Sequence, residues 1–372
     1  MYTLMNDALL KSLTLLLLII IGLLLKGKFG NRDQVNGIKE LVLTIALPTT
    51  IFISLMKIEM DGALLMVPVM TLAFNCIMYV LTPLSFGWFH IEKDSAAART
   101  MTMLVPSLAP GLSCFPFIAE FLGQKSLAVA ALADVGNKFF VLIALYMLAL
   151  SMYLKNNKAA GSEAPVNRSD KIKSLLKSLV SEPINLFIFA ALALLGFGVG
   201  YDSLPAVITS VFDRTSAMMT PLVLIYIGLA VQLKEGKKKM VMSILMFRAG
   251  ITLLLSGLVI FLAGIADPGT ALLVVVIPLS SASFWPMAHI SAFNLKEDTA
   301  GVSREGRTFD LNLAILVLAF SLPFSTLLIL GILSSGTLFA HTPTLIFSGL
   351  ALLAVSFVPQ LLTKVHFGLS KA

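Results

Sequence analysis

The sequence predicts an all-α membrane protein made of two inverted five-helix repeats, with crossed broken helices in spans 4 and 9 and an extra C-terminal span. Three observations predict this fold: a very apolar composition, a hydrophobic pattern that occurs twice, and a one-sided distribution of Lys and Arg. Of the 372 residues, 58% are hydrophobic and 13% are charged, and the mean hydropathy is +0.94. Soluble domains carry about twice that charged fraction. The chain is therefore expected to lie in a lipid bilayer.

Apolar segments of about 18 residues or more follow one another, and each is long enough to cross a hydrocarbon core of about 30 Å. A helical bundle is expected, because the alternation typical of a membrane β-barrel is absent and Leu15–Leu25 is continuously apolar. Eleven spans are expected near residues 9–26, 38–56, 63–89, 100–123, 125–153, 182–200, 215–233, 240–264, 269–294, 306–335 and 343–364.

A basic segment at 156–181 is the one long connection expected between spans, and a short helix is predicted within it at Lys171–Leu179. It divides the chain into a first five-span repeat, 1–155, and a second repeat, 182–335. Residues 336–372 hold the extra C-terminal span and a tail.

The basic residues predict the orientation. Loops after spans 1, 3, 5, 7 and 9 hold 19 Lys and Arg, whereas the N-terminus and the other loops hold 4. By the positive-inside rule the N-terminus lies outside and the C-terminus in the cytoplasm, in a cell (inner) membrane. Five spans per repeat make the second repeat inverted. Because the positive charge lies in short loops between spans, we expect no nucleic-acid partner. Cys76 and Cys114 lie in apolar segments and predict neither a disulfide nor a metal site.

The repeated pattern centres on two prolines, Pro116 and Pro286, which are 170 residues apart. Over residues 115–152 against 285–322, 8 of 38 positions are identical, about twice what chance gives in so Ala- and Leu-rich a chain. Proline-interrupted segments in corresponding places are typical of secondary transporters.

Spans 4 and 9 carry the predicted substrate site. Span 4 holds three prolines and a glycine between Pro106 and Pro116, and span 9 holds three serines between Pro278 and Pro286. An interior proline costs about 3 kcal/mol in a helix, so both spans are expected to break. Two breaks that meet at the bilayer centre would form a polar pocket, and helix N-termini there suit a carboxylate. Kinked helices whose serines bond their own backbone are the alternative. The candidate substrate-binding residues are Ser107, Ala109, Pro110, Gly111, Ser113, Ser280, Ser281 and Ser283.

Ionisable and amide residues inside spans are costly in lipid and call for a reason. Asp134 and Lys138 lie four residues apart on one helix face, and Asp310 lies in the matching part of span 10, three residues after Arg307. Either acid could carry a proton or a cation; alternatively, the charges form neutralised intrahelical pairs. The candidates for ion coupling or its support are Asp134, Asn137, Lys138, Asp310, Asn312, Asn75 and Arg248. His289 is expected near an interface.

Several segments, in their order and spacing, resemble the auxin efflux carrier family of permeases. The resemblance implies two inverted five-span repeats, a scaffold domain, and a transport domain that holds two crossed, broken helices. It also implies organic-anion substrates such as dicarboxylates. The chain departs from the family at Ala109, where an asparagine is usual, and in its extra C-terminal span. The segments are Arg99–Gly123, Ala131–Asn137, Leu47-Pro48, Pro221–Leu229 and Leu322-Pro323.

The sequence therefore predicts a secondary active transporter for a small organic anion that works by alternating access. It is not expected to be an enzyme, because no H-E-x-x-H, G-x-S-x-G or Gly-rich nucleotide motif is present. No cofactor is expected. The coupling ion is left open between a proton and sodium, and so is homodimer formation. The alternatives are a sodium-coupled symporter of the bile-acid type and a membrane-embedded sensor.

Overall fold

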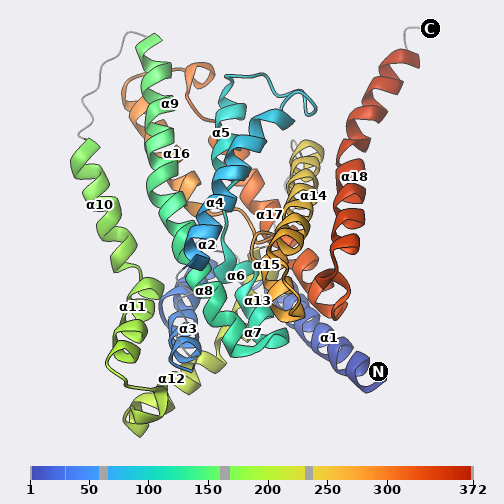
Figure 1. Cartoon of the computed structure of the whole chain (residues 1–372). Coiled ribbons are helices and arrows are strands. Elements are labelled where there is room, and N and C mark those ends of the chain that lie inside the picture. Colours follow the sequence, from blue (N-terminus) through green and yellow to red (C-terminus); the bar gives the residue numbers. More distant parts are fainter. Residues whose placement is uncertain (1, 30, 58–65, 160–167, 231–237, 370–372) are drawn as a thin grey trace.

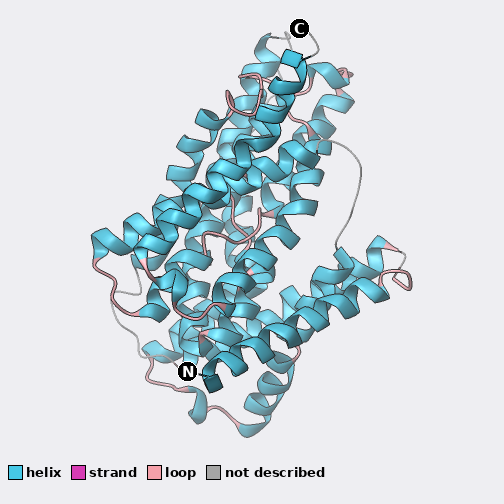
Figure 2. Cartoon of the chain, turned by 90° about the vertical axis from the view of Figure 1, so that its right-hand side faces the viewer, coloured by secondary structure: helices cyan, strands magenta, loops and turns pink. Residues whose placement is uncertain are grey.

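The computed structural model describes residues 2–29, 31–57, 66–159, 168–230 and 238–369, and these are almost entirely helical without a β-strand. In Figure 2 the helices surround short loop segments in the middle of the molecule. The first half contains α1 (Tyr2–Leu25), α2 (Arg32–Leu41), η1 (Val42–Ala46), α3 (Leu47–Met56), α4 (Met66–Leu81), η3 (Thr82–Ser85), α5 (Ala96–Leu104), α6 (Pro110–Ser113), α7 (Phe115–Phe121), α8 (Gly123–Phe139), η4 (Phe140–Ala144) and α9 (Leu145–Ala159).

The second half is also almost entirely helical, and it ends in one long additional helix. Its elements are α10 (Arg168–Ser181), α11 (Pro183–Gly196), η5 (Tyr201–Ser203), α12 (Ala206–Ala217), α13 (Met219–Ala230), α14 (Lys238–Ala263), α15 (Pro268–Val276), α16 (Phe284–Thr299), η6 (Arg304–Gly306), α17 (Leu311–Ser334), η7 (Leu338–Ala340) and α18 (Thr342–Leu369).

Five helical stretches of the described chain are long and apolar enough to cross a membrane, by length and composition. This supports the expected class, an all-α membrane protein. The eleven spans and the orientation of the termini stay predictions. The five stretches are Asp33–Met56, Met66–Ser85, Gly123–Asn156, Lys238–Ala263 and Leu311–Ser334.

Two buried cores organise the helices. One core joins α1, α3, α7, α11, α13 and α15, and the other joins α5, α9, α16 and the first part of α17. In Figure 1 the helices α3, α7, α11 and α12 lie in the lower half, whereas α5, α9 and α16 lie in the upper half. The long helices α14 and α17 contribute to both cores. The region where the two cores meet is also where the chain leaves helical geometry.

Glycines allow several helix pairs to approach at backbone distance. A Cβ atom on Gly228 of α13 would lie 2.1 Å from the carbonyl oxygen of Ile19 in α1, and one on Gly22 would meet Ile225 of α13 at 2.2 Å. Small residues permit this contact between membrane helices. The extra helix α18 packs on α14 in the same way, through Gly349.

Several boundaries differ from the expected spans. The predicted span 215–233 is divided, since α12 ends at Ala217 and α13 begins at Met219. Span 10 begins later than expected, at Leu311, because Asp310 caps the helix. The short helix predicted at Lys171–Leu179 is the longer α10.

Candidate functional site at the helix crossing

Two non-helical segments, 105–109 and 277–283, meet in what we call the helix crossing. α5 ends at Leu104 and α6 begins at Pro110, while α15 ends at Val276 and α16 begins at Phe284. The backbone N–H of Ala109 donates to the carbonyl oxygen of Ser281 at 2.8 Å, in an isolated antiparallel bridge. Segments about 170 residues apart in the sequence are thus in direct contact.

Serine hydroxyls of the first segment and of α6, which follows it, accept hydrogen bonds from backbone amides of the second segment. The Ser107 hydroxyl accepts from the N–H of Ser283 at 3.0 Å, and the Ser113 hydroxyl accepts from the N–H of Ser281 at 2.9 Å. Both hydroxyls also donate, Ser107 to Leu104 and Ser113 to Ala109. Buried amides outside a helix need such partners. These two serines therefore stabilise the crossing itself.

The other predicted substrate residues surround this contact. The Ser280 hydroxyl donates to the carbonyl of Ile277, and the Ser283 hydroxyl caps α16 by accepting from Trp285. Sequence analysis missed Ser321 of α17, whose hydroxyl accepts from the N–H of Ala282 at 3.2 Å. All eight predicted residues belong to the crossing or to the helical turn after it: Ser107, Ala109, Pro110, Gly111, Ser113, Ser280, Ser281 and Ser283.

Asn137 of α8 holds the first segment of the crossing through both the backbone N–H and the backbone carbonyl of Leu108. Its side chain donates to the carbonyl of Leu108 at 2.9 Å and accepts from the N–H of the same residue at 3.2 Å. An amide can do this because it carries both a donor and an acceptor. Asn137 also donates to Asp134 and accepts from Asn75. The Asn75 Oδ1 atom is buried without a hydrogen-bond partner in the described chain.

Arg248 of α14 lies at the end of α5 and is 4% exposed. Its guanidinium donates to the carbonyls of Val105 at 2.8 Å and Ser107 at 3.1 Å. Carbonyls at a helix C-terminus lack partners and carry partial negative charge, so a cation stabilises them. No ion pair involves Arg248 among the described residues. The sequence offered no partner for this arginine because its partners are backbone atoms far away in the chain.

A second polar group, which we call the Lys138 cluster, comprises Asp134, Lys138, Glu182 and Asn185. The Lys138 ammonium lies 3.4 Å from Asp134, 3.1 Å from Glu182 and 3.3 Å from the amide oxygen of Asn185. The side chains of Lys138 and Asp134 are 6% and 5% exposed, and that of Glu182 is 22% exposed. With both acids ionised the cluster carries a formal charge of −1. It joins α8 to the start of α11.

The expected Asp134–Lys138 pair is therefore present, but it has a third charged member that the sequence analysis missed. Glu182 is the first residue of the expected span 182–200 and directly follows the basic segment 156–181. The available signal was Asn185, an amide within the apolar stretch that follows Pro183.

The second predicted acid is not part of any such cluster. Asp310 caps α17 by accepting from the N–H of Leu313 at 3.0 Å, and its own N–H donates to Thr100. The alternative for this acid, a pair with Arg307, does not form among the described residues, because Arg307 pairs with Asp298 across the preceding turn. Asn312 is exposed. His289, expected near an interface, is buried with a ring nitrogen 2.9 Å from the carbonyl oxygen of Val141.

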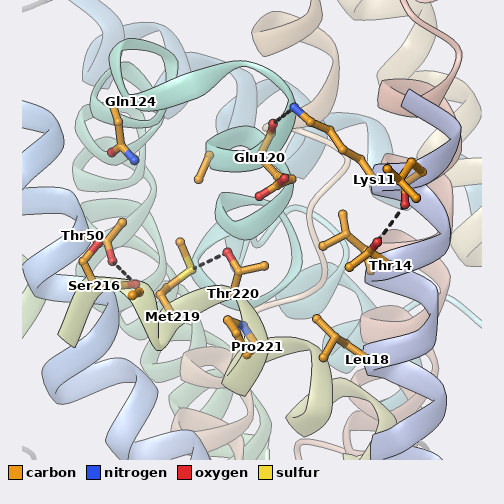
Figure 3. A pocket seen from close by; sticks show the side chains of 14 residues that line it. Lys11, Thr14, Leu18, Thr50, Glu120, Gln124, Ser216, Met219, Thr220 and Pro221 are labelled. Atoms are coloured by element: carbon orange, nitrogen blue, oxygen red, sulfur yellow. Dashed lines mark hydrogen bonds between the residues drawn. The ribbon is translucent and has the colours of Figure 1, made fainter. Parts of the chain in front are cut away.

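Two cavities stand out in the described chain, and neither is lined by the predicted serines. A polar cavity of about 510 Å³ lies between α1, α3, α7, α8 and α13 (Figure 3). An apolar cavity of about 220 Å³ lies between α4, α8, α14 and α15 and reaches Ile277 and Pro278.

Comparisons with known proteins add no family to this geometry. No protein-family model matches the chain, and no curated protein matches it either.

Proposed function

We propose that this protein is a secondary active transporter for a small organic anion, which binds at the helix crossing and is carried by alternating access. The observation that carries the proposal is the direct contact of two non-helical segments inside an apolar, helical protein. Unwound backbone within a membrane persists where protein or a water-filled cavity satisfies it, and transporters use such breaks as binding sites.

The proposal includes two inverted repeats, 1–155 and 182–335, and a fold similar to that of the auxin efflux carriers. Support comes from the matched positions of the two breaks, at Pro106–Pro116 and Pro278–Pro286. The charge distribution supports an outside N-terminus, a cytoplasmic C-terminus and a location in the cell (inner) membrane.

The chemistry of the crossing suits an anion. Three backbone amides in a row, those of Ser281, Ala282 and Ser283, point at serine hydroxyls rather than at carbonyl groups. As an acceptor of a backbone N–H, a carboxylate oxygen forms a stronger hydrogen bond than a serine hydroxyl oxygen. A bound anion can therefore replace these hydroxyls as the acceptor. The N-terminus of α16 adds a positive dipole end at the same place.

Ion coupling is assigned to the Lys138 cluster. One ammonium between two carboxylates leaves a charge of −1 in a largely buried place, and binding a proton or a monovalent cation removes it. The cluster joins α8, which also holds the crossing through Asn137, to α11. A change in the charge of the cluster therefore alters the contact between the crossing and a neighbouring helix.

Flux measured with purified protein in liposomes tests this function. Uptake of labelled dicarboxylates is expected under an imposed ion gradient, and it should be compared under proton and sodium gradients. Uptake that strictly requires sodium would favour the symporter of the bile-acid type. Binding without flux of any organic anion, under either gradient, contradicts the transporter and favours a sensor.

A further inference from the structure

The polar cavity of about 510 Å³ lies apart from the crossing, between helices from distant parts of the chain. Figure 3 shows α1 on one side and the side chains of Thr50 and Ser216 on the other, with Glu120 and Gln124 above. A volume of this size falls in the range of small-molecule sites. Its lining is unusual for this chain, because it includes one basic and one acidic side chain.

The two charged residues of the cavity do not neutralise each other. The Lys11 ammonium donates to the backbone carbonyl of Glu120 at 2.9 Å, and no ion pair joins the two side chains. The Glu120 carboxylate has no hydrogen bond or ion pair among the described residues, and the residue is half-buried. A carboxylate in such a place lacks compensation unless water or a cationic group reaches it.

Neutral donors lie on the remaining walls. The Gln124 side-chain oxygen accepts from Ser54, so its NH₂ group is left for another acceptor. Among the described residues, the Thr220 hydroxyl makes only a weak contact of 3.9 Å to the sulfur of Met219. Ser216 also lines the cavity, and its backbone carbonyl accepts from Thr50 at 3.5 Å.

We propose that this cavity binds a small amino acid, a molecule that carries a carboxylate and an ammonium group together. The Lys11 ammonium holds the carboxylate, and the Glu120 carboxylate holds the ammonium. A plain organic anion would meet Lys11 but would leave Glu120 unmatched, so the cavity discriminates by the ammonium group. This site is separate from the helix crossing, and its occupancy does not depend on transport.

The experiment measures equilibrium binding of three probes to the purified full-length protein by calorimetry. L-glutamate and L-glutamine carry the ammonium group, and glutarate has the same carbon chain without it. At least one amino acid should bind about tenfold tighter than glutarate or better. Glu120→Gln should reduce this preference to about threefold or less, and Lys11→Gln should weaken binding of every probe by about tenfold.

Matched controls make the same charge changes away from the cavity. Lys125→Gln and Glu92→Gln alter exposed residues that do not line it, so they should bind all probes like the unaltered protein. Thr220→Val removes a hydroxyl from the cavity wall without changing the charge, and it should weaken amino-acid binding. It tests the site even if the charge variants fail to fold. Glutarate bound as tightly as either amino acid, no binding of any probe, or charge variants that match their controls would each overturn the proposal.

Binding and flux separate this proposal from the proposed function. If the unaltered protein binds no amino acid while Lys11→Gln still takes up organic anions, the amino-acid site is refuted and the proposed transport function stands. Amino-acid binding that depends on Lys11 and Glu120, without any uptake of organic anions, does the opposite.

Discussion

Asp134 and Asp310 occupy corresponding regions of the two halves, yet their surroundings differ in kind. Asp134 is 4% exposed and shares Lys138 with Glu182, whereas Asp310 is partly exposed and accepts from the backbone at a helix start. The first half has turned an acid into part of a charged cluster between helices, and the second half uses its acid as a cap. The expected repeat therefore does not extend to the surroundings of these two acids.

The largest expected effect follows from removing the cation of the Lys138 cluster. Lys138→Ala leaves Asp134 and Glu182 without their shared ammonium, and loss of one member of a buried ion pair costs about 3–5 kcal/mol. Thermal unfolding in detergent should show a strongly lowered midpoint. The double variant Lys138→Ala with Asp134→Asn should recover part of the loss. A midpoint within a degree or two of the unaltered protein would show that the cluster contributes little.

The second prediction separates the two acids by function. Asp134→Asn keeps the size of the side chain and removes its charge, so ion-driven accumulation of substrate should be lost while exchange of internal for external substrate largely remains. Asp310→Asn should leave both activities unchanged, because Asn caps a helix about as well as Asp. Flux in liposomes with and without an ion gradient measures the difference. Equal behaviour of the two variants would remove the assigned asymmetry.

The third prediction concerns the crossing, which joins the two halves. Ser113→Ala leaves the N–H of Ser281 without its acceptor, and an unpaired buried amide costs about 1–3 kcal/mol. Ser107→Ala should behave alike through the N–H of Ser283. Ser335→Ala is a matched control, because this hydroxyl only donates to a carbonyl at the end of α17. Thermal midpoints lowered equally in all three variants would contradict a special role for the crossing.

The smallest expected effect belongs to the helix cap. Asp310→Ala should destabilise α17 by about 1 kcal/mol, since the N–H of Leu313 loses its acceptor. Asp310→Asn should restore nearly all of this. If the Ala and Asn variants melt at the same temperature, the cap is not what the aspartate contributes.

The sequence predicts interactions between residues that are close in the chain, but not those between residues that are far apart in it. The ends of α5 and α15 lie next to Pro106 and Pro278, because a proline acts on the turn that precedes it. The spacing of Asp134 and Lys138 likewise predicts a local pair. The partners of Arg248 and Asn137 are backbone atoms reached only after folding, so no residue pattern announces them.

The polar cavity was beyond prediction for the same reason. Lys11 and Glu120 are 109 residues apart, so no local pattern brings them together. Glu182 was missed because its charged partner, Lys138, lies 44 residues earlier in the chain. Ser321 gave a better signal, as a hydroxyl in the middle of an apolar helix.

The contact between α1 and α13 has a mechanical consequence. Where Gly22 meets Gly228 there is no side chain between the two backbones, so there are no rotamers that could rearrange while one helix slides along the other. Displacement at that point would drive carbonyl oxygens into Cα atoms. The two helices should therefore move together as one rigid body, and hydrogen exchange at their amides should stay slow in every state that the protein visits. Any large movement must take place at interfaces where longer side chains can give way.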